Sequence, residues 1–193
     1  MKRLLAALIA TAAVATTAAP AFAAEVAYKL DAAHTETTFT IDRFGFTSII
    51  GIFAKSEGTI WLDEAAPEKS RVEATVTVDS LLTADPTRDQ HVKGERWLNA
   101  AKNPTMTFKS TKVEKTGDMT AKVTGDMTIM GVTQPAVLDV KLNKIGTAPN
   151  NQKKQAGFTI TGTVSRKAFG SAGAAGIIGD AVAIRIETLA VAQ

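Results

Sequence analysis

The sequence predicts an all-β fold, a sandwich or barrel of antiparallel strands with one short helical insertion. Two observations predict this class. Apolar and polar residues alternate with a period of two in several segments, as in strands with one buried face. Turn residues separate these segments at short intervals, which is typical of antiparallel sandwiches and barrels. The helical insertion is predicted by a third pattern, which lies between two of the strands.

The clearest strand is predicted at residues 71–79, where Val72, Ala74, Val76 and Val78 alternate with polar residues. The same alternation predicts strands at 105–109, 138–142, 158–164 and 182–187, and further strands are expected at 26–31, 35–42, 57–63 and 119–129. Turn signals lie at 63–67, 116–118 and 149–151. A barrel of about eight such strands either fills its interior with side chains or holds one small ligand.

The helical insertion begins at Asp85, a residue type that caps helix N-termini, followed by Pro86 at the first helical position. Residues 87–93 continue the helix and Gly94 ends it. A second short turn of helix is expected at 95–101. The insertion is placed to cap one end of a barrel.

The first residues have the pattern of a secretory signal peptide. Lys2 and Arg3 precede a charge-free apolar run at 4–15, and the small-x-small sequence at 21–23 resembles a cleavage site. We therefore expect a signal peptide at 1–23 and a single exported domain at 24–193, with a bacterial periplasm as its compartment.

Composition excludes several classes of function. The chain has 22 Lys and Arg against 19 Asp and Glu, and two of the basic residues belong to the leader, so a basic nucleic-acid surface is not expected. The absence of Cys excludes disulfides, thiolate zinc sites and a lipidated Cys. No apolar run after the leader is long enough to form a transmembrane helix.

Few residues signal catalysis. The two histidines are His34 and His91, and a metal site built on them would need Asp89 or Asp31 as well. No serine lies in the Gly-x-Ser-x-Gly pattern of hydrolases. The glycine-rich run at 170–179 lacks the signature of a phosphate loop and is interpreted as a connection that borders a ligand entrance.

Basic residues are candidates for a pocket mouth. Arg88 and His91 are three residues apart and share a face of the predicted helix, and Arg43 is a third candidate. Such groups suit a pyrophosphate or a carbonyl head group. The alternative is that Arg88 pairs locally with Asp85 or Glu95 on the surface.

A series of short motifs resembles the YceI-like family of exported, lipocalin-like proteins. The matching segments, in order, are 28–35 (Asp31, His34), 44–53 (Phe44-Gly45-Phe46, Gly51-Ile52-Phe53), 88–92, 103–111, 125–135 and 166–170 (Arg166, Phe169-Gly170). Three positions depart from the family pattern: Arg43 stands where His is frequent, Met130 where His or Asn is frequent, and Ala168 where Asp is frequent.

The resemblance implies an eight-stranded antiparallel lipocalin-like barrel with a helical segment beside it. It also implies binding of a long polyisoprenoid lipid, of the isoprenoid quinone or isoprenyl pyrophosphate type, inside the barrel, without catalysis or a cofactor. With strand alternation, the expected apolar lining is Phe39, Ile41, Phe44, Phe46, Phe53, Val76, Trp97, Met106, Phe108, Phe158 and Phe169. The expected polar residues near the mouth are Arg43, Arg88, Asp89 and His91.

Other functions stay open at this point. One alternative is a periplasmic hydrolase or metal-dependent enzyme that uses His34, His91 and Asp89. A second is an accessory to membrane electron transfer that delivers or stores quinone, with a membrane cytochrome as its partner. A homodimer is also considered, as is a structural module whose barrel is filled by its own side chains. An inward-pointing Arg43 would favour an anionic head group over a neutral quinone carbonyl.

Overall fold

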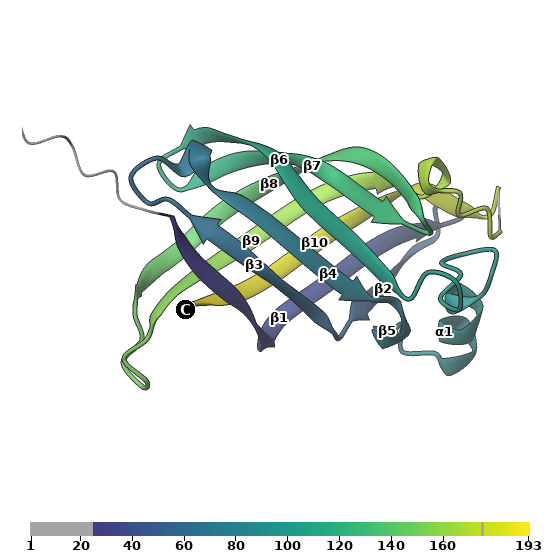
Figure 1. The fold of residues 1–193 in the computed structure, drawn as a ribbon. Helices are drawn as coiled ribbons and strands as arrows, with labels where there is room; N and C mark the ends of the chain where they lie inside the picture. Colours follow the sequence, from purple (N-terminus) through teal and green to yellow (C-terminus); the bar gives the residue numbers. More distant parts are fainter. Residues whose placement is uncertain (1–24, 175) are drawn as a thin grey trace, which may run out of the picture.

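The period-two segments form strands that pair antiparallel with one another (Figure 1). The computed structural model describes residues 25–174 and 176–193, so the signal peptide expected at 1–23 lies outside the described residues. The strands are β1 (Val26–Arg43), β2 (Thr47–Phe53), β3 (Ser56–Leu62), β4 (Arg71–Thr77), β5 (Leu81–Leu82), β6 (Thr105–Gly117), β7 (Thr120–Ile129), β8 (Val132–Thr147), β9 (Lys154–Ser165) and β10 (Ile178–Ala192).

Pairing between the first and last long strands closes the sheet. The order is β10-β9-β8-β7-β6-β4-β3-β1-β2-β5, and β10 also pairs with β1. The long strand β1 pairs with β3 through residues 26–29 and with β2 through residues 37–43. β2 and β3 thus form one interrupted wall of the barrel, which has eight antiparallel walls in all. The expected eight-stranded barrel is confirmed.

The strand predictions at 26–31 and 35–42 belong to one continuous strand, because β1 also includes residues 32–34 between them. Its register with β10 shifts between Leu30 and Thr35, which indicates a bulge at this point. The strand at 71–79 ends earlier than expected, since a 3₁₀ turn occupies Val78–Ser80. Strand β2 was not predicted, because its run of isoleucines lacks a clear alternation.

Helix α1 (Pro86–Lys93) confirms the predicted insertion and lies at one end of the barrel (Figure 1). The Asp85 carboxylate accepts a hydrogen bond from the Arg88 N–H at 3.0 Å, and this bond lowers the pKa of Asp85. No helix among the described residues is long and apolar enough to cross a membrane.

The second helical turn expected at 95–101 is wrong, because this segment forms non-helical turns. Its N–H groups reach back to the end of α1: those of Leu98, Asn99 and Ala100 donate to the carbonyls of Val92, Gly94 and Lys93. These bonds satisfy the last carbonyls of the helix and fold the segment back over it.

The end of the barrel opposite α1 is closed by a packed core. Tyr28, Ala156 and Ala190 are fully buried there, and Phe158 is nearly so. The Tyr28 hydroxyl donates to Glu64 Oε1 at 3.3 Å, which satisfies the buried polar atom. Burial is the main cause that raises the pKa of Tyr28. We call this packed core the plug. It forms the closed end of the barrel interior.

Candidate functional site

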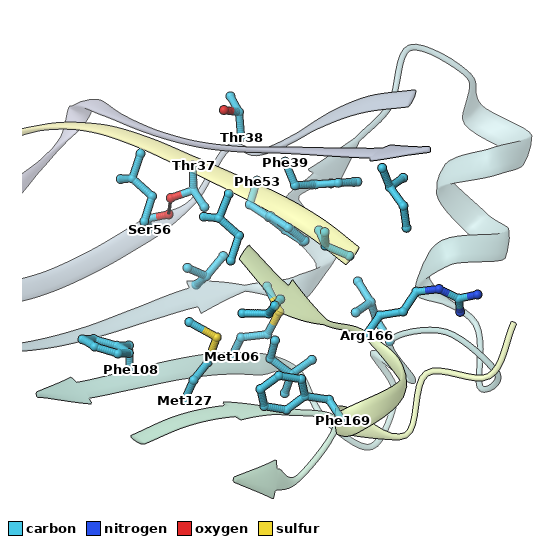
Figure 2. Close-up of a pocket in the computed structure, with 18 of the residues that line it drawn as sticks. Thr37, Thr38, Phe39, Phe53, Ser56, Met106, Phe108, Met127, Arg166 and Phe169 are labelled. Atoms are coloured by element: carbon cyan, nitrogen blue, oxygen red, sulfur yellow. Dashed lines mark hydrogen bonds between the residues drawn. The ribbon is translucent and has the colours of Figure 1, made fainter. Parts of the chain in front are cut away.

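A cavity of about 450 Å³ occupies the barrel between the plug and the end that carries α1. Its volume lies within the range of small-molecule binding pockets. Figure 2 shows Phe39, Phe53, Met106 and Met127 reaching from different strands into this space. Inward positions of all eight walls contribute, which is how strand alternation builds the interior of a small barrel.

Most of the apolar residues expected from the sequence line the cavity. They are Phe39, Ile41, Phe53, Val76, Trp97, Met106, Phe108 and Phe169. Val76 shows the underlying pattern, because Val72, Ala74 and Val76 all line the cavity while the residues between them face outward. Whether these side chains contact a ligand stays a prediction.

Three of the expected residues do not line the cavity. Phe158 has the correct inward parity but lies in the plug, in contact with Tyr28 and its neighbours. Phe44 and Phe46 are exposed, with 49% and 89% of their surfaces accessible, because they lie in the turn between β1 and β2. Alternation fixes the side of a strand that a residue faces, and it does not apply within a turn.

Glycines on neighbouring strands make room for two of the aromatic rings. A Cβ atom at Gly51 would lie 2.3 Å from ring atoms of Phe39, and one at Gly125 would lie 2.6 Å from Phe108 Cζ. Each ring therefore lies flat over the backbone of the adjacent strand. This close approach keeps both rings against the wall and leaves the centre of the barrel open.

Pairs of hydroxyl groups lie among the apolar side chains of the cavity. Thr37 Oγ1 and Ser56 Oγ are 2.9 Å apart (Figure 2), and Thr35 Oγ1 and Thr188 Oγ1 are 2.7 Å apart. All four residues line the cavity. Because each hydroxyl has a partner in the protein, none needs a hydrogen bond from a ligand, and the wall behaves as largely apolar.

The mouth of the cavity is basic. Arg43, Arg88 and His91 line it, as expected, and Arg166 adds a third guanidinium. Among the described residues, no Asp or Glu lines the cavity. Three guanidinium groups beside an apolar space, with no carboxylate in the described lining, favour an anionic group on whatever enters it.

Arg166 is the residue that sequence reasoning missed. Its guanidinium donates to the backbone carbonyls of Ser171, Ile178 and Gly179 at 2.9, 3.2 and 2.8 Å. It also lies 5.3 Å from the ring centre of Trp97. The side chain is buried, and no carboxylate of the described chain lies within ion-pair distance of it. Its position just before a glycine-rich run was the available signal.

Arg88 and Asp89 both attach α1 to the barrel. The Asp89 carboxylate accepts hydrogen bonds from the N–H and hydroxyl of Thr83 at 2.7 and 2.6 Å. Arg88 Nε donates to the Thr83 hydroxyl at 2.8 Å, and its Nη2 donates to the Thr83 carbonyl. Asp89 does not line the cavity, so its expected place beside a ligand is replaced by this anchoring contact. Arg88 both anchors the helix and lines the mouth.

The structure does not bring His34, His91 and Asp89 together into one cluster. His34 Nδ1 lies 2.7 Å from Asp31 at the bulge of β1 and is exposed, while His91 lines the mouth. Asp89 is engaged by Thr83. Within residues 25–174 and 176–193, no group of three His, Cys, Asp or Glu residues has the geometry to hold a metal ion.

The glycine-rich connection at 170–179 borders the mouth, as expected. Ser171, Ala174, Ile177 and Ile178 line the cavity. The Arg96 carbonyl accepts hydrogen bonds from the N–H groups of Ala172 and Gly173 at 3.1 and 2.7 Å, which joins this connection to the segment after α1. A Cβ atom at Gly173 would lie 2.2 Å from the Trp97 ring, so the two segments pack closely.

Solved structures share this barrel. BcnA of Burkholderia cenocepacia aligns with a TM-score of 0.74 at 22% identity, covering 83% of this chain and 98% of that protein. The YceI protein of Campylobacter jejuni aligns with a TM-score of 0.69 at 28% identity, covering 77% and 87%. A polyisoprenoid binding domain from Saccharophagus degradans aligns with a TM-score of 0.65 at 13% identity, covering 87% and 99%.

Sequence comparisons identify the family. The UPF0312 protein of Pseudomonas savastanoi pv. phaseolicola is 36% identical over 156 residues, 81% of each chain. Protein YceI of Salmonella arizonae is 36% identical over 153 residues, 79% of each chain. The model of the YceI-like domain matches residues 28–190, nearly the whole described barrel. The chain therefore belongs to the YceI-like family.

Proposed function

We propose that the barrel binds a polyisoprenoid lipid, with the tail in the cavity and an anionic head group at the mouth. The observation that carries this proposal is the combination of an apolar cavity of about 450 Å³ with three arginines and no acidic residue among its described lining. The likeness to a polyisoprenoid binding domain supports the choice of tail. The role is one of carriage or storage, and it assigns no reaction to the barrel.

The tail and the head group of the ligand would be bound by different forces, the hydrophobic effect and electrostatic attraction. Burying one isoprene unit of five carbons contributes roughly 4 kcal/mol before the costs of ordering are subtracted. The tail therefore supplies most of the affinity. Arg43 is exposed and contacts the Phe44 ring at 5.5 Å, while Arg166 is fixed by its carbonyl partners. The head group is selected between an exposed cation and a buried one that its carbonyl partners hold in place.

The expected compartment follows from the leader. The pattern at 1–23 supports export to a bacterial periplasm. Delivery or storage of quinone for a membrane cytochrome is the second candidate. It needs a neutral carbonyl head group, which the arginines at the mouth can hydrogen-bond but which their charge does not favour over an anion.

The test compares ligands that share one tail. We would measure binding of an isoprenyl diphosphate, the matching isoprenol and an isoprenoid quinone to delipidated protein. Trp97 lines the cavity and reports binding by fluorescence in a Trp61→Phe background, because Trp61 instead lies under Arg71 at 3.5 Å. We expect the diphosphate to bind at least about tenfold more tightly than the alcohol, with a difference that decreases at high salt.

Two charge reversals locate the effect. Arg43→Glu removes a cation from the mouth and is expected to abolish most of the preference for the diphosphate. Lys141→Glu makes the same change of charge on the outer face of β8 and should leave the preference intact. Equal binding of alcohol and diphosphate, or an unchanged preference in Arg43→Glu, would overturn the assignment of the head group. Failure of all three ligands to bind would overturn the proposed function itself.

A further inference from the structure

Three exposed apolar side chains lie together beside the cavity mouth. They are Phe44, Phe46 and Ile177, of which 49%, 89% and 41% is exposed. The Phe44 N–H donates to the Ile177 carbonyl at 3.1 Å, which holds the β1–β2 turn against the glycine-rich connection. Apolar side chains that are grouped and exposed, as at this cavity mouth, are uncommon on protein surfaces and indicate an interaction site.

The turn that presents Phe44 and Phe46 is hydrogen-bonded and strained. Phe44 and Gly45 have φ angles of +59° and +72°, which is typical of the type I′ turn of a tight hairpin. The Phe46 N–H donates to the Arg43 carbonyl at 3.1 Å, and the Gly45 N–H donates to the Asp42 carboxylate at 2.9 Å. A bulky side chain at positive φ is unfavourable, and Asn or Gly is the usual choice. Phe44 therefore costs stability at this position.

These residues are continuous with the cavity. Arg43, which precedes Phe44, lines the cavity, and so does Ile177 itself. A lipid that leaves a bilayer through this group of side chains would enter the mouth without crossing water. The cavity and the exposed side chains thus form one apolar path.

Basic residues outnumber acidic ones in the segments beside the exposed group. We define the rim as residues 42–47, 85–103, 166–174 and 176–180, which together carry seven Lys or Arg and five Asp or Glu. Four of the five acidic side chains accept hydrogen bonds from backbone N–H groups at or beside the rim, namely Asp42, Asp85, Asp89 and Asp180. With seven basic against five acidic side chains, the rim has a small positive excess, which favours an anionic surface.

We propose that the rim docks on the surface of an anionic lipid bilayer, with Phe44, Phe46 and Ile177 inserted among the lipids, so that the cavity opens onto the membrane. This inference rests on the proposed function, because it supplies the route by which the barrel exchanges a lipid ligand. Aromatic side chains with nearby cations are the groups that bind at the interface of a bilayer. Arg43 lies beside Phe44 in that arrangement.

The test uses sedimentation with vesicles of phosphatidylglycerol and phosphatidylethanolamine. The variant Phe44→Asn with Phe46→Ser removes both rings and relieves the strain at positive φ, so folding is retained. We expect the vesicle partition coefficient to fall roughly 100-fold, since each partly inserted ring accounts for about a factor of ten. The control Met119→Ser removes an apolar side chain, 43% exposed, from the β6–β7 turn and should partition like the unmodified chain.

A second readout separates this inference from ligand binding. The double variant is expected to bind an isoprenyl diphosphate from detergent solution with unchanged affinity but to take it up from vesicles much more slowly. Equal sedimentation of the double variant and the unmodified chain would overturn the docking surface. So would a concentration-dependent dimer that is lost in the double variant, because the exposed group would then be covered by a second copy. Loss of binding in detergent by every form would instead overturn the proposed function.

Discussion

Enlarging Ala74 distinguishes a ligand cavity from a filled core. Ala74 lies in β4 and lines the cavity between Val72 and Val76. The substitution Ala74→Leu adds three carbons that point into the cavity. If this space accepts a lipid tail, the added group and the tail compete for it. If the interior were a packed core, the same group would have nowhere to go.

The two cases predict opposite changes in the free energy of unfolding of the Ala74→Leu variant. Burying three additional carbons contributes roughly 2 kcal/mol, and fixing the leucine rotamer costs about 0.5–1 kcal/mol. The delipidated variant should therefore gain about 1–2 kcal/mol, which raises Tm by about 2–8 °C for a chain of this size. The tail should lose contact with up to one isoprene unit, or roughly 4 kcal/mol, so affinity falls by as much as about 1000-fold. Overpacking a filled core would instead destabilise the protein by about 1–3 kcal/mol.

Thermal unfolding and ligand titration of the delipidated protein measure both effects. The matched control is Ala183→Leu, which makes the same change on the outer face of β10 and should alter neither quantity appreciably. Stabilisation together with weaker binding supports the account. A variant that unfolds at lower temperature and still binds the ligand with full affinity would refute the reasoning.

Three further predictions concern the supports of the site. Asp89→Ala leaves the N–H and hydroxyl of Thr83 without their acceptor and should lower the free energy of unfolding in urea by about 2–4 kcal/mol. The control Asp139→Ala breaks an exposed ion pair and should lower it by less than about 1 kcal/mol. Equal losses would contradict the anchoring role of Asp89. The Lys167 N–H and the Ser165 hydroxyl hold the pKa of Asp180 below its ordinary value of 3.8, so the stability that the carboxylate contributes is present above that value and is lost as pH falls through the lower, folded-state pKa. Asp180→Asn should therefore lose less stability than the unmodified chain below about pH 4, and parallel acid unfolding curves would disprove this. Gly51→Val should push Phe39 into the cavity, which lowers stability by about 1–3 kcal/mol and reduces ligand uptake. In the control Gly146→Val, the new Cβ atom meets nothing, so uptake should not change. A Gly51→Val protein with normal uptake would contradict the close packing of Phe39.

Much of the barrel can be predicted from the sequence because its walls obey a period of two. Strands with one polar face, such as β4 and β10, are visible in this way. Strand β2 is not, since Ile49 faces the cavity and Ile50 is exposed, so two apolar neighbours face opposite sides. The bulge in β1 is also hidden, because Asp31 and His34, between Leu30 and Thr35, interrupt the apolar alternation of the strand.

Strand alternation predicts which side chains face inward, but not how far along the barrel axis each side chain lies. Phe108 and Phe158 both face inward, yet one lines the cavity and the other lies in the plug. Their heights depend on the stagger between neighbouring strands, which arises from pairings far apart in the sequence. The role of Arg166 is hidden for a similar reason, because two of its three carbonyl partners belong to β10, outside its own turn.

The central claim is that the barrel carries a polyisoprenoid lipid, and native mass spectrometry of protein exported by its own host tests it most directly. The account predicts a complex heavier than the mature chain by the mass of one lipid, which organic extraction and fragmentation identify as an isoprenoid with a phosphate or diphosphate head group. Protein that has only the mass of the chain, in several preparations under gentle conditions, would contradict the claim.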